Sequence, residues 1–107
     1  MKRTTELATR EIRGFLLKFL YDSYPEGITL KLMEALLPPW GYFCSQKDIR
    51  RALNYLLDKN MVVTRDIDLP ADINSQIKVY LTARGYGFLV EKERDPEIIP
   101  PAELDDA

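Results

Sequence analysis

One short stretch of the chain carries most of the side chains that could recognise a charged partner. Between residues 45 and 59, guanidinium, ammonium and carboxamide groups recur at helical spacing, and they belong to Gln46, Lys47, Arg50, Arg51, Asn54 and Lys59. Arginine can form two hydrogen bonds with guanine, asparagine and glutamine can do so with adenine, and lysine suits a phosphate. These residue types are therefore the ones that contact the bases and backbone of duplex DNA.

The sequence offers few candidate residues for metal binding, disulfide formation or catalysis. The chain has no histidine, the commonest metal ligand and general base near neutral pH, and its one cysteine, Cys44, cannot form an internal disulfide. We find no glycine-rich phosphate loop and no carboxylate pair in a recognisable catalytic motif. We therefore expect a binding protein and not an enzyme, with no cofactor and no metal ion.

Length and composition favour one domain. The 107 residues are 46% hydrophobic, which suits one modest core, and no apolar run approaches the roughly 20 residues of a membrane span. The polar residues after Met1-Lys2-Arg3 do not form a secretory signal, so we expect a cytoplasmic protein without membrane contact. We expect a domain over residues 4–94, followed by an acidic, proline-containing tail over 95–107 that is extended or disordered.

The spacing of apolar residues predicts the elements of the first half. A helix with apolar residues three and four apart is capped by Thr4 or Thr5 and ends near Tyr24-Pro25. A very short strand at Ile28 and a second helix follow. The side chain of Thr29 caps that helix, and Pro38-Pro39 ends it.

The third helix has the sharpest local signal. Ser45 and Asp48 have the spacing of a capping box, in which each side chain accepts a hydrogen bond from the other residue's backbone. The inner face of this helix is aliphatic, and it ends near Lys59-Asn60. If that aliphatic face packs inward, the polar residues named first project outward.

A spacing of two residues then predicts a β-hairpin. Its first strand places Met61, Val63, Ile67 and Leu69 on one face, and its second strand, over 76–81, places Ile77, Val79 and Leu81 on one face. Residues 70–75 form the connecting loop, and Thr82 caps a last helix.

This order of elements carries a resemblance to a known family. The run Ser45-Gln46-Lys47-Asp48-Ile49-Arg50-Arg51-Ala52-Leu53-Asn54-Tyr55-Leu56, followed by Lys59-Asn60-Met61-Val62, resembles the recognition helix and first wing strand of winged helix-turn-helix regulators of the PadR, MarR and ArsR types. Tyr80-Leu81-Thr82-Ala83-Arg84-Gly85 resembles the passage from their wing to their last helix. Over residues 7–95 the chain is most similar to small winged-helix proteins of Mu-like prophages.

The resemblance implies a fold and a function. The fold is of the α+β class, with a three-helix core, a two- or three-stranded β-wing and a C-terminal helix. The function is that of a phage-type transcriptional regulator that reads duplex DNA with helix 45–59 and forms a homodimer through its first and last helices. The chain departs from the pattern in the long segment over 38–44 and in a wing whose Asp66, Asp68 and Asp72 outnumber its cations.

Two alternatives stay open. A solvated helix face uses the same residue types as helix 45–59, and residues 61–107 hold ten acidic side chains against five basic ones. The acidic excess over residues 61–107 favours a protein interaction module that uses its acidic wing and tail. The aromatic residues Trp40, Tyr42 and Phe43 either cover the core, the simpler interpretation, or contact a base or a partner's pocket.

Overall fold

The structure is a computed structural model that describes residues 6–67 and 76–101. Its elements in chain order are α1 (Glu6–Ser23), β1 (Ile28–Thr29), α2 (Leu30–Leu36), the short 3₁₀ helix η1 (Pro38–Trp40), α3 (Gln46–Asp58), β2 (Val62–Ile67), β3 (Gln76–Leu81) and α4 (Ala83–Val90). The predicted α+β class is confirmed, and the helices and strands follow the predicted order.

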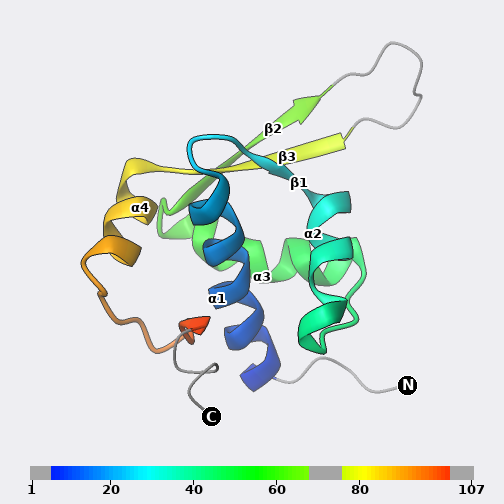
Figure 1. Cartoon of the computed structure of the whole chain (residues 1–107), viewed down its shortest axis with the longest axis horizontal. Coiled ribbons are helices and arrows are strands. Elements are labelled where there is room, and N and C mark those ends of the chain that lie inside the picture. Colours follow the sequence, from blue (N-terminus) through cyan, green and yellow to red (C-terminus); the bar gives the residue numbers. More distant parts are fainter. Residues whose placement is uncertain (1–5, 68–75, 102–107) are drawn as a thin grey trace.

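The three strands form one antiparallel sheet in the order β1-β3-β2. Figure 1 shows α1, α2 and α3 on one side of this sheet, α4 at one end, and the β2–β3 hairpin extending past the helices. One core joins these elements, because fully buried Leu16 and Leu20 of α1, Met33 of α2, Ile49 of α3 and Val79 of β3 belong to the same cluster. No helix in the described part of the chain is long and apolar enough to cross a membrane.

The predicted caps set the starts of three helices. Thr29 Oγ1 accepts a hydrogen bond from the Leu32 backbone, and Thr82 Oγ1 accepts one from Gly85. At α3 the capping box is complete, with distances of 3.2 Å in both directions between Ser45 and Asp48. Asn60 follows α3 with a φ of 61°, the left-handed conformation expected after a helix end. The caps predicted for α1, Thr4 and Thr5, lie outside the described residues.

The predicted inner face of the first hairpin strand is wrong. Val62 is buried and Val63 is 46% exposed, because Val62 pairs with Leu81 and Leu81 faces the core. Residues opposite one another in a ladder share a face of the sheet, so the register with β3 decides which parity of β2 points inward. The inner face predicted for β3, with Ile77, Val79 and Leu81, is confirmed.

The predicted tail is also wrong in its first part. We expected residues from 95 onward to be extended or disordered, yet Ile98 is only 4% exposed and the Ile99 amide donates a hydrogen bond to the Arg10 carbonyl at 3.1 Å. Gly14 permits this packing, since a Cβ atom there would collide with the Ile99 carbonyl. Residues 95–101, here named the C-terminal segment, therefore belong to the domain, whereas 102–107 lie outside the described residues.

Candidate nucleic-acid interface

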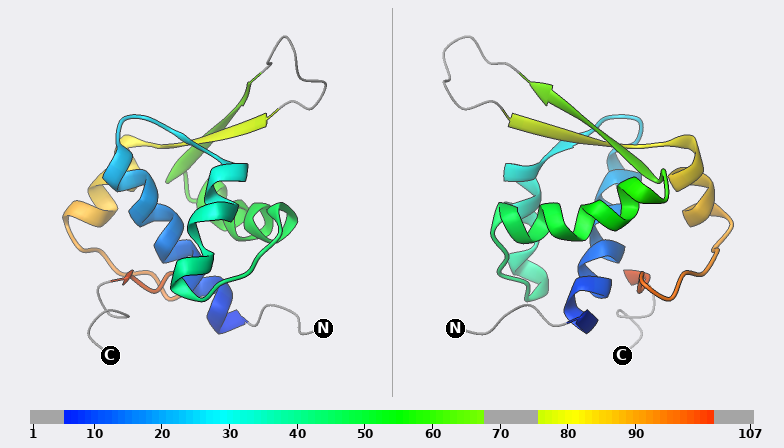
Figure 2. Two further views of the ribbon diagram at one scale, coloured as in Figure 1. Left: turned by 45° about the vertical axis from the view of Figure 1, so that its right-hand side comes forward. Right: turned by 180° about the vertical axis from the view of Figure 1, so that it is seen from behind.

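The exposed side of α3 brings five of the six predicted site residues together. Ile49, Leu53 and Leu56 are at most 2% exposed, so the opposite side of the helix faces solvent. There, an open depression of about 420 Å³ is lined by Gln46, Lys47, Arg50, Arg51 and Asn54, here named the α3 stripe. Figure 2 shows α3 in front when the molecule is viewed from behind.

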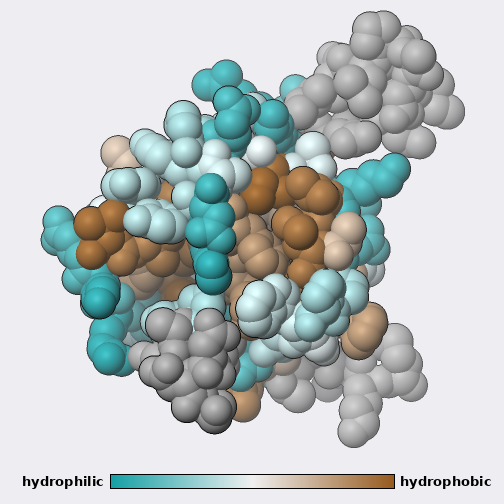
Figure 3. All heavy atoms as spheres, viewed as in Figure 1, coloured by the Kyte–Doolittle hydropathy of each residue, from teal (hydrophilic) through white to brown (hydrophobic). Residues whose placement is uncertain are grey.

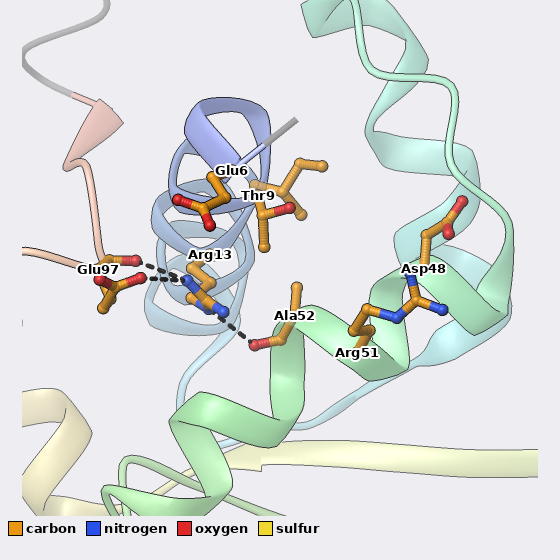
Figure 4. A pocket seen from close by; sticks show the side chains of 8 residues that line it. Glu6, Thr9, Arg13, Asp48, Arg51, Ala52 and Glu97 are labelled. Carbon is orange, nitrogen blue, oxygen red and sulfur yellow. Dashed lines mark hydrogen bonds and ion pairs between the residues drawn. The ribbon is translucent and has the colours of Figure 1, made fainter. Parts of the chain in front are cut away.

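The cations of the α3 stripe are not used to hold the fold together. Arg50 and Arg51 are exposed, and the ion pairs found among the described residues do not involve them. Asp48, the nearest carboxylate along the helix, already accepts a hydrogen bond from the Ser45 backbone. In Figure 4 the Arg51 side chain lies beside Asp48 and away from the polar contacts around Arg13. Lys47, Arg50 and Arg51 therefore present positive charge to solvent.

Gln46 is partly committed to another element. Its side-chain amide donates a hydrogen bond to Glu34 Oε1 of α2 at 3.3 Å. This contact links the start of α3 to α2 and fixes the direction of the amide. A carboxylate thus borders the stripe at its amino-terminal end and reduces the positive potential there.

Lys59 is separated from the other predicted site residues. It follows the last residue of α3, at about 18 Å from Lys47 along the helix axis for a rise of 1.5 Å per residue. Its ammonium lies 5.5 Å from the centre of the Tyr55 ring, and its carbonyl accepts a hydrogen bond from Arg84 Nε at 2.9 Å. The structure does not place Lys59 in the α3 stripe.

A set of polar contacts holds α3 against α1 and the C-terminal segment. Arg13 Nε donates to the Ala52 carbonyl at 3.1 Å and Arg13 Nη1 donates to the Glu97 carbonyl at 3.0 Å (Figure 4). Arg13 also lies 4.9 Å from the Tyr55 ring centre, and the Tyr55 hydroxyl contacts both carboxylate oxygens of Asp95 at 2.8 Å. We call Arg13, Tyr55, Asp95 and Glu97 the Arg13 clamp. The clamp fixes the position of α3 from its covered side.

The hollow between α1 and α3 differs from the α3 stripe in its charges. It has a volume of about 340 Å³ and mixes the carboxylates of Glu6, Asp48 and Glu97 with the guanidinium groups of Arg13 and Arg51. Arg13 and Glu97 already interact with each other. In the described ranges, no cluster of potential ligands could hold a metal ion.

The hairpin carries a second cationic surface that the sequence did not reveal. Arg65 pairs with Lys78 across the two strands, and both side chains lie 5.6 Å from the centre of the Tyr80 ring. Asp66 pairs with Ile77 and so belongs to the other face. A count of charges along the wing does not show that these cations and Asp66 lie on opposite faces of the hairpin. The alternation of side chains along each strand was the signal in the sequence that could have shown it. Asp68 and Asp72 lie outside the described residues.

The aromatic residues before α3 divide into two groups. The rings of Trp40 and Tyr42 lie 5.0 and 5.5 Å from that of Phe15. Tyr42 packs against the core as predicted, whereas Trp40 contacts Phe15 and remains 46% exposed. The Tyr42 hydroxyl donates to Glu11 at 2.6 Å, and burial together with this hydrogen bond raises the pKa of Tyr42. Phe43, in contrast, is 83% exposed, so the expectation of core packing is wrong for this residue.

Cys44 is buried, and burial raises the pKa of its thiol. A raised pKa lowers the fraction of reactive thiolate at neutral pH.

The sequence as a whole matches no protein family model, and no curated protein matches it.

Proposed function

We propose that this chain is a winged-helix protein that binds duplex DNA with the exposed side of α3. The observation that carries the proposal is the α3 stripe, in which Lys47, Arg50 and Arg51 are solvent-facing and lie next to the carboxamides of Gln46 and Asn54. An α-helix fits the major groove, where these side chains have partners on bases and phosphates.

The arrangement of elements supports the same proposal. A third helix followed by an antiparallel hairpin, with β1 on the outer edge of β3, is the expected layout of a winged helix. The cations Arg65 and Lys78 on one hairpin face would suit a phosphate backbone beside the groove that α3 occupies. The role that we propose is that of a phage-type transcriptional regulator.

A salt titration tests DNA binding. Fluorescence anisotropy of a labelled random-sequence duplex should show log affinity falling with log salt, with a slope of about −2.7 if the three cations of the α3 stripe each meet a phosphate. Arg50→Ala should lessen the slope by about 0.9, because one counterion fewer is released. Lys31→Ala, which removes an exposed cation of α2 outside both the α3 stripe and the apolar groove, is the matched control and should leave the slope unchanged. Affinity that does not vary with salt would contradict the proposal.

A protein contact is the second candidate, and an apolar groove favours it. The groove, of about 580 Å³, includes Phe88, Leu89, Val90, Ile98, Pro100 and Pro101, and no residue of α3 lines it. Figure 3 shows hydrophobic side chains over α4 on this face. Its rim carries both signs of charge, with Lys18 and Lys92 near Asp22 and Glu93. We propose that a second copy of the chain covers it, since a twofold contact can pair such a rim with itself.

Sedimentation equilibrium tests this homodimer, which uses α1 and α4 and leaves α3 free. Val90→Asp should shift the protein to a monomer because it places a charge on an exposed apolar residue of that face, whereas Leu32→Asp, at a similarly exposed residue of α2, should not. Equal dimer fractions in the two variants would remove the groove as the interface. For the alternative of an acidic wing and tail that bind protein, five of the ten acidic residues over 61–107 lie outside the described ranges. Asp95 and Glu97 of the predicted tail contact Tyr55 and Arg13 within the domain.

A further inference from the structure

Phe43 is the most exposed large hydrophobic side chain in the described part of the chain, at 83%. Single apolar residues on a surface need no explanation by themselves. Phe43 differs from Trp40 and Tyr42 of the same loop, whose rings pack on Phe15. The neighbours of Phe43 in the chain keep its side chain in solvent.

The residues on both sides of Phe43 are anchored. Tyr42 packs on Phe15 and donates to Glu11, and Cys44 is buried in the core. With both neighbours held against the protein, the Phe43 side chain is left in solvent. The backbone is fixed on either side by the 2.8 Å hydrogen bond from Gly41 to Pro38 and by the capping box that begins at Ser45. The outward direction of Phe43 is therefore built into the loop.

Phe43 also closely precedes the α3 stripe in the chain. It lies three residues before Gln46 and four before Lys47, at the amino-terminal end of α3. In helix-turn-helix complexes this end of the recognition helix contacts the base edges. Among the groups that the major groove presents, the apolar one is the C5-methyl of thymine.

We propose that Phe43 packs on the C5-methyl group of a thymine beside the bases that α3 reads, and thereby adds a preference for thymine at that position. This inference rests on the proposed DNA-binding function. It assigns to Phe43 an apolar contact that the cations and carboxamides of the α3 stripe cannot make.

Deoxyuridine supplies the test, because it lacks only the methyl group. The probes are a duplex that the wild-type protein enriches from a random pool and the same duplex with every thymine replaced by uracil. The wild type should bind the uracil duplex about fourfold more weakly, the equivalent of one buried methyl group, and Phe43→Ala should bind both duplexes equally. The salt slope of Phe43→Ala should equal that of the wild type, because no charge is removed.

Leu32→Ala, a truncation at an exposed apolar residue of α2 outside both the α3 stripe and the apolar groove, is the matched control and should keep the wild-type response to uracil. An unchanged melting temperature of Phe43→Ala will show that the fold is intact. If Phe43→Ala binds like the wild type while Arg50→Ala binds weakly, the thymine contact is refuted and the proposed function survives. The contact is equally refuted if uracil weakens both proteins alike. If the wild type enriches no duplex but binds a random-sequence duplex with the expected salt slope, the thymine contact is refuted and the proposed function survives. If it binds no duplex at all, both proposals fail.

Discussion

At the scale of single residues, side chains of the same type have opposite roles in this protein. Arg13 is 12% exposed and uses its guanidinium to join α1, α3 and the C-terminal segment, whereas Arg50 is exposed and makes none of the ion pairs found in the described ranges. In the amino-acid composition, Arg13 and Arg50 count as equal cations. Their surroundings make Arg13 a structural contact and leave Arg50 available to a ligand.

Tyr55 makes the Arg13 clamp sensitive to alkali. Burial and the hydrogen bond to Asp95 raise the pKa of Tyr55 to about 12, from the ordinary tyrosine value of 10.0. A pKa that is higher in the folded state stabilises the fold fully below pH 10, and this contribution is lost as the pH rises from 10 to 12.

We therefore expect the urea midpoint of the wild type to fall over that pH range, and to fall less steeply in Tyr55→Phe. Tyr55→Phe should also be less stable at neutral pH, by about 0.5 to 1.5 kcal/mol for the lost hydrogen bond. Tyr21→Phe, at an exposed tyrosine, should follow the wild-type curve. Parallel curves for wild type and Tyr55→Phe would show that Tyr55 does not cause the alkaline loss.

At the scale of elements, the contact between α1 and the C-terminal segment depends on one missing side chain. Glycine inside a helix is ordinarily less favourable than alanine by about 1 kcal/mol. At Gly14 the exchange has the opposite sign, since the added Cβ would collide with the Ile99 carbonyl.

Gly14→Ala should accordingly destabilise the protein, by about 1 to 3 kcal/mol for a small overpacked group, and should expose the C-terminal segment to protease. Gly87→Ala is the matched control within α4, where a Cβ meets nothing within 4 Å, and it should stabilise the protein by about 0.5 to 1 kcal/mol. Urea unfolding measures both changes. A stabilised Gly14→Ala would mean that the segment does not pack on α1 as described.

What the sequence could predict at this scale follows from the range of the interactions involved. Helix starts at Thr29, Ser45 and Thr82 depend on residues three positions away, and the sequence predicts each of them. The inner face of β2 depends on the register with β3, and the docking of Ile98 depends on a glycine more than 80 positions earlier. Neither can be obtained from local periodicity or composition. The predicted tail over 95–107 is rich in acidic residues and proline, which concealed two adjacent isoleucines.

The candidate site shows the same division. Helical periodicity correctly places five of the predicted residues on one side of α3, because that side is set by the aliphatic face opposite to it. It could not show that Lys59 lies at the far end, beside Tyr55, or that Arg65 and Lys78 share a face of the hairpin.

At the scale of the whole molecule, the domain boundary decides how the acidic end of the chain can be studied. Removing everything after Asp95 also removes Ile98 and the Glu97 contacts of Arg13. A chain that ends at Pro101 keeps both.

We expect the chain that ends at Pro101 to unfold at the wild-type urea concentration, and the chain that ends at Asp95 to lose about 2 to 5 kcal/mol, as for the loss of a buried isoleucine. Only the longer chain can therefore show whether residues 102–107 affect the proposed DNA binding. Equal stability of the two would place the boundary at Asp95 after all.

The Arg13 clamp can form only late in synthesis of the chain. Arg13 and Glu97 are 84 positions apart, so α1 leaves the ribosome long before its partner is translated. Until then Arg13 lacks its Glu97 partner, and the Gly14 surface of the first helix stays uncovered. The contacts of the C-terminal segment with α1 and α3 thus form only after residue 97 has emerged, and a stalled or shortened translation product would offer chaperones and proteases an incompletely closed domain.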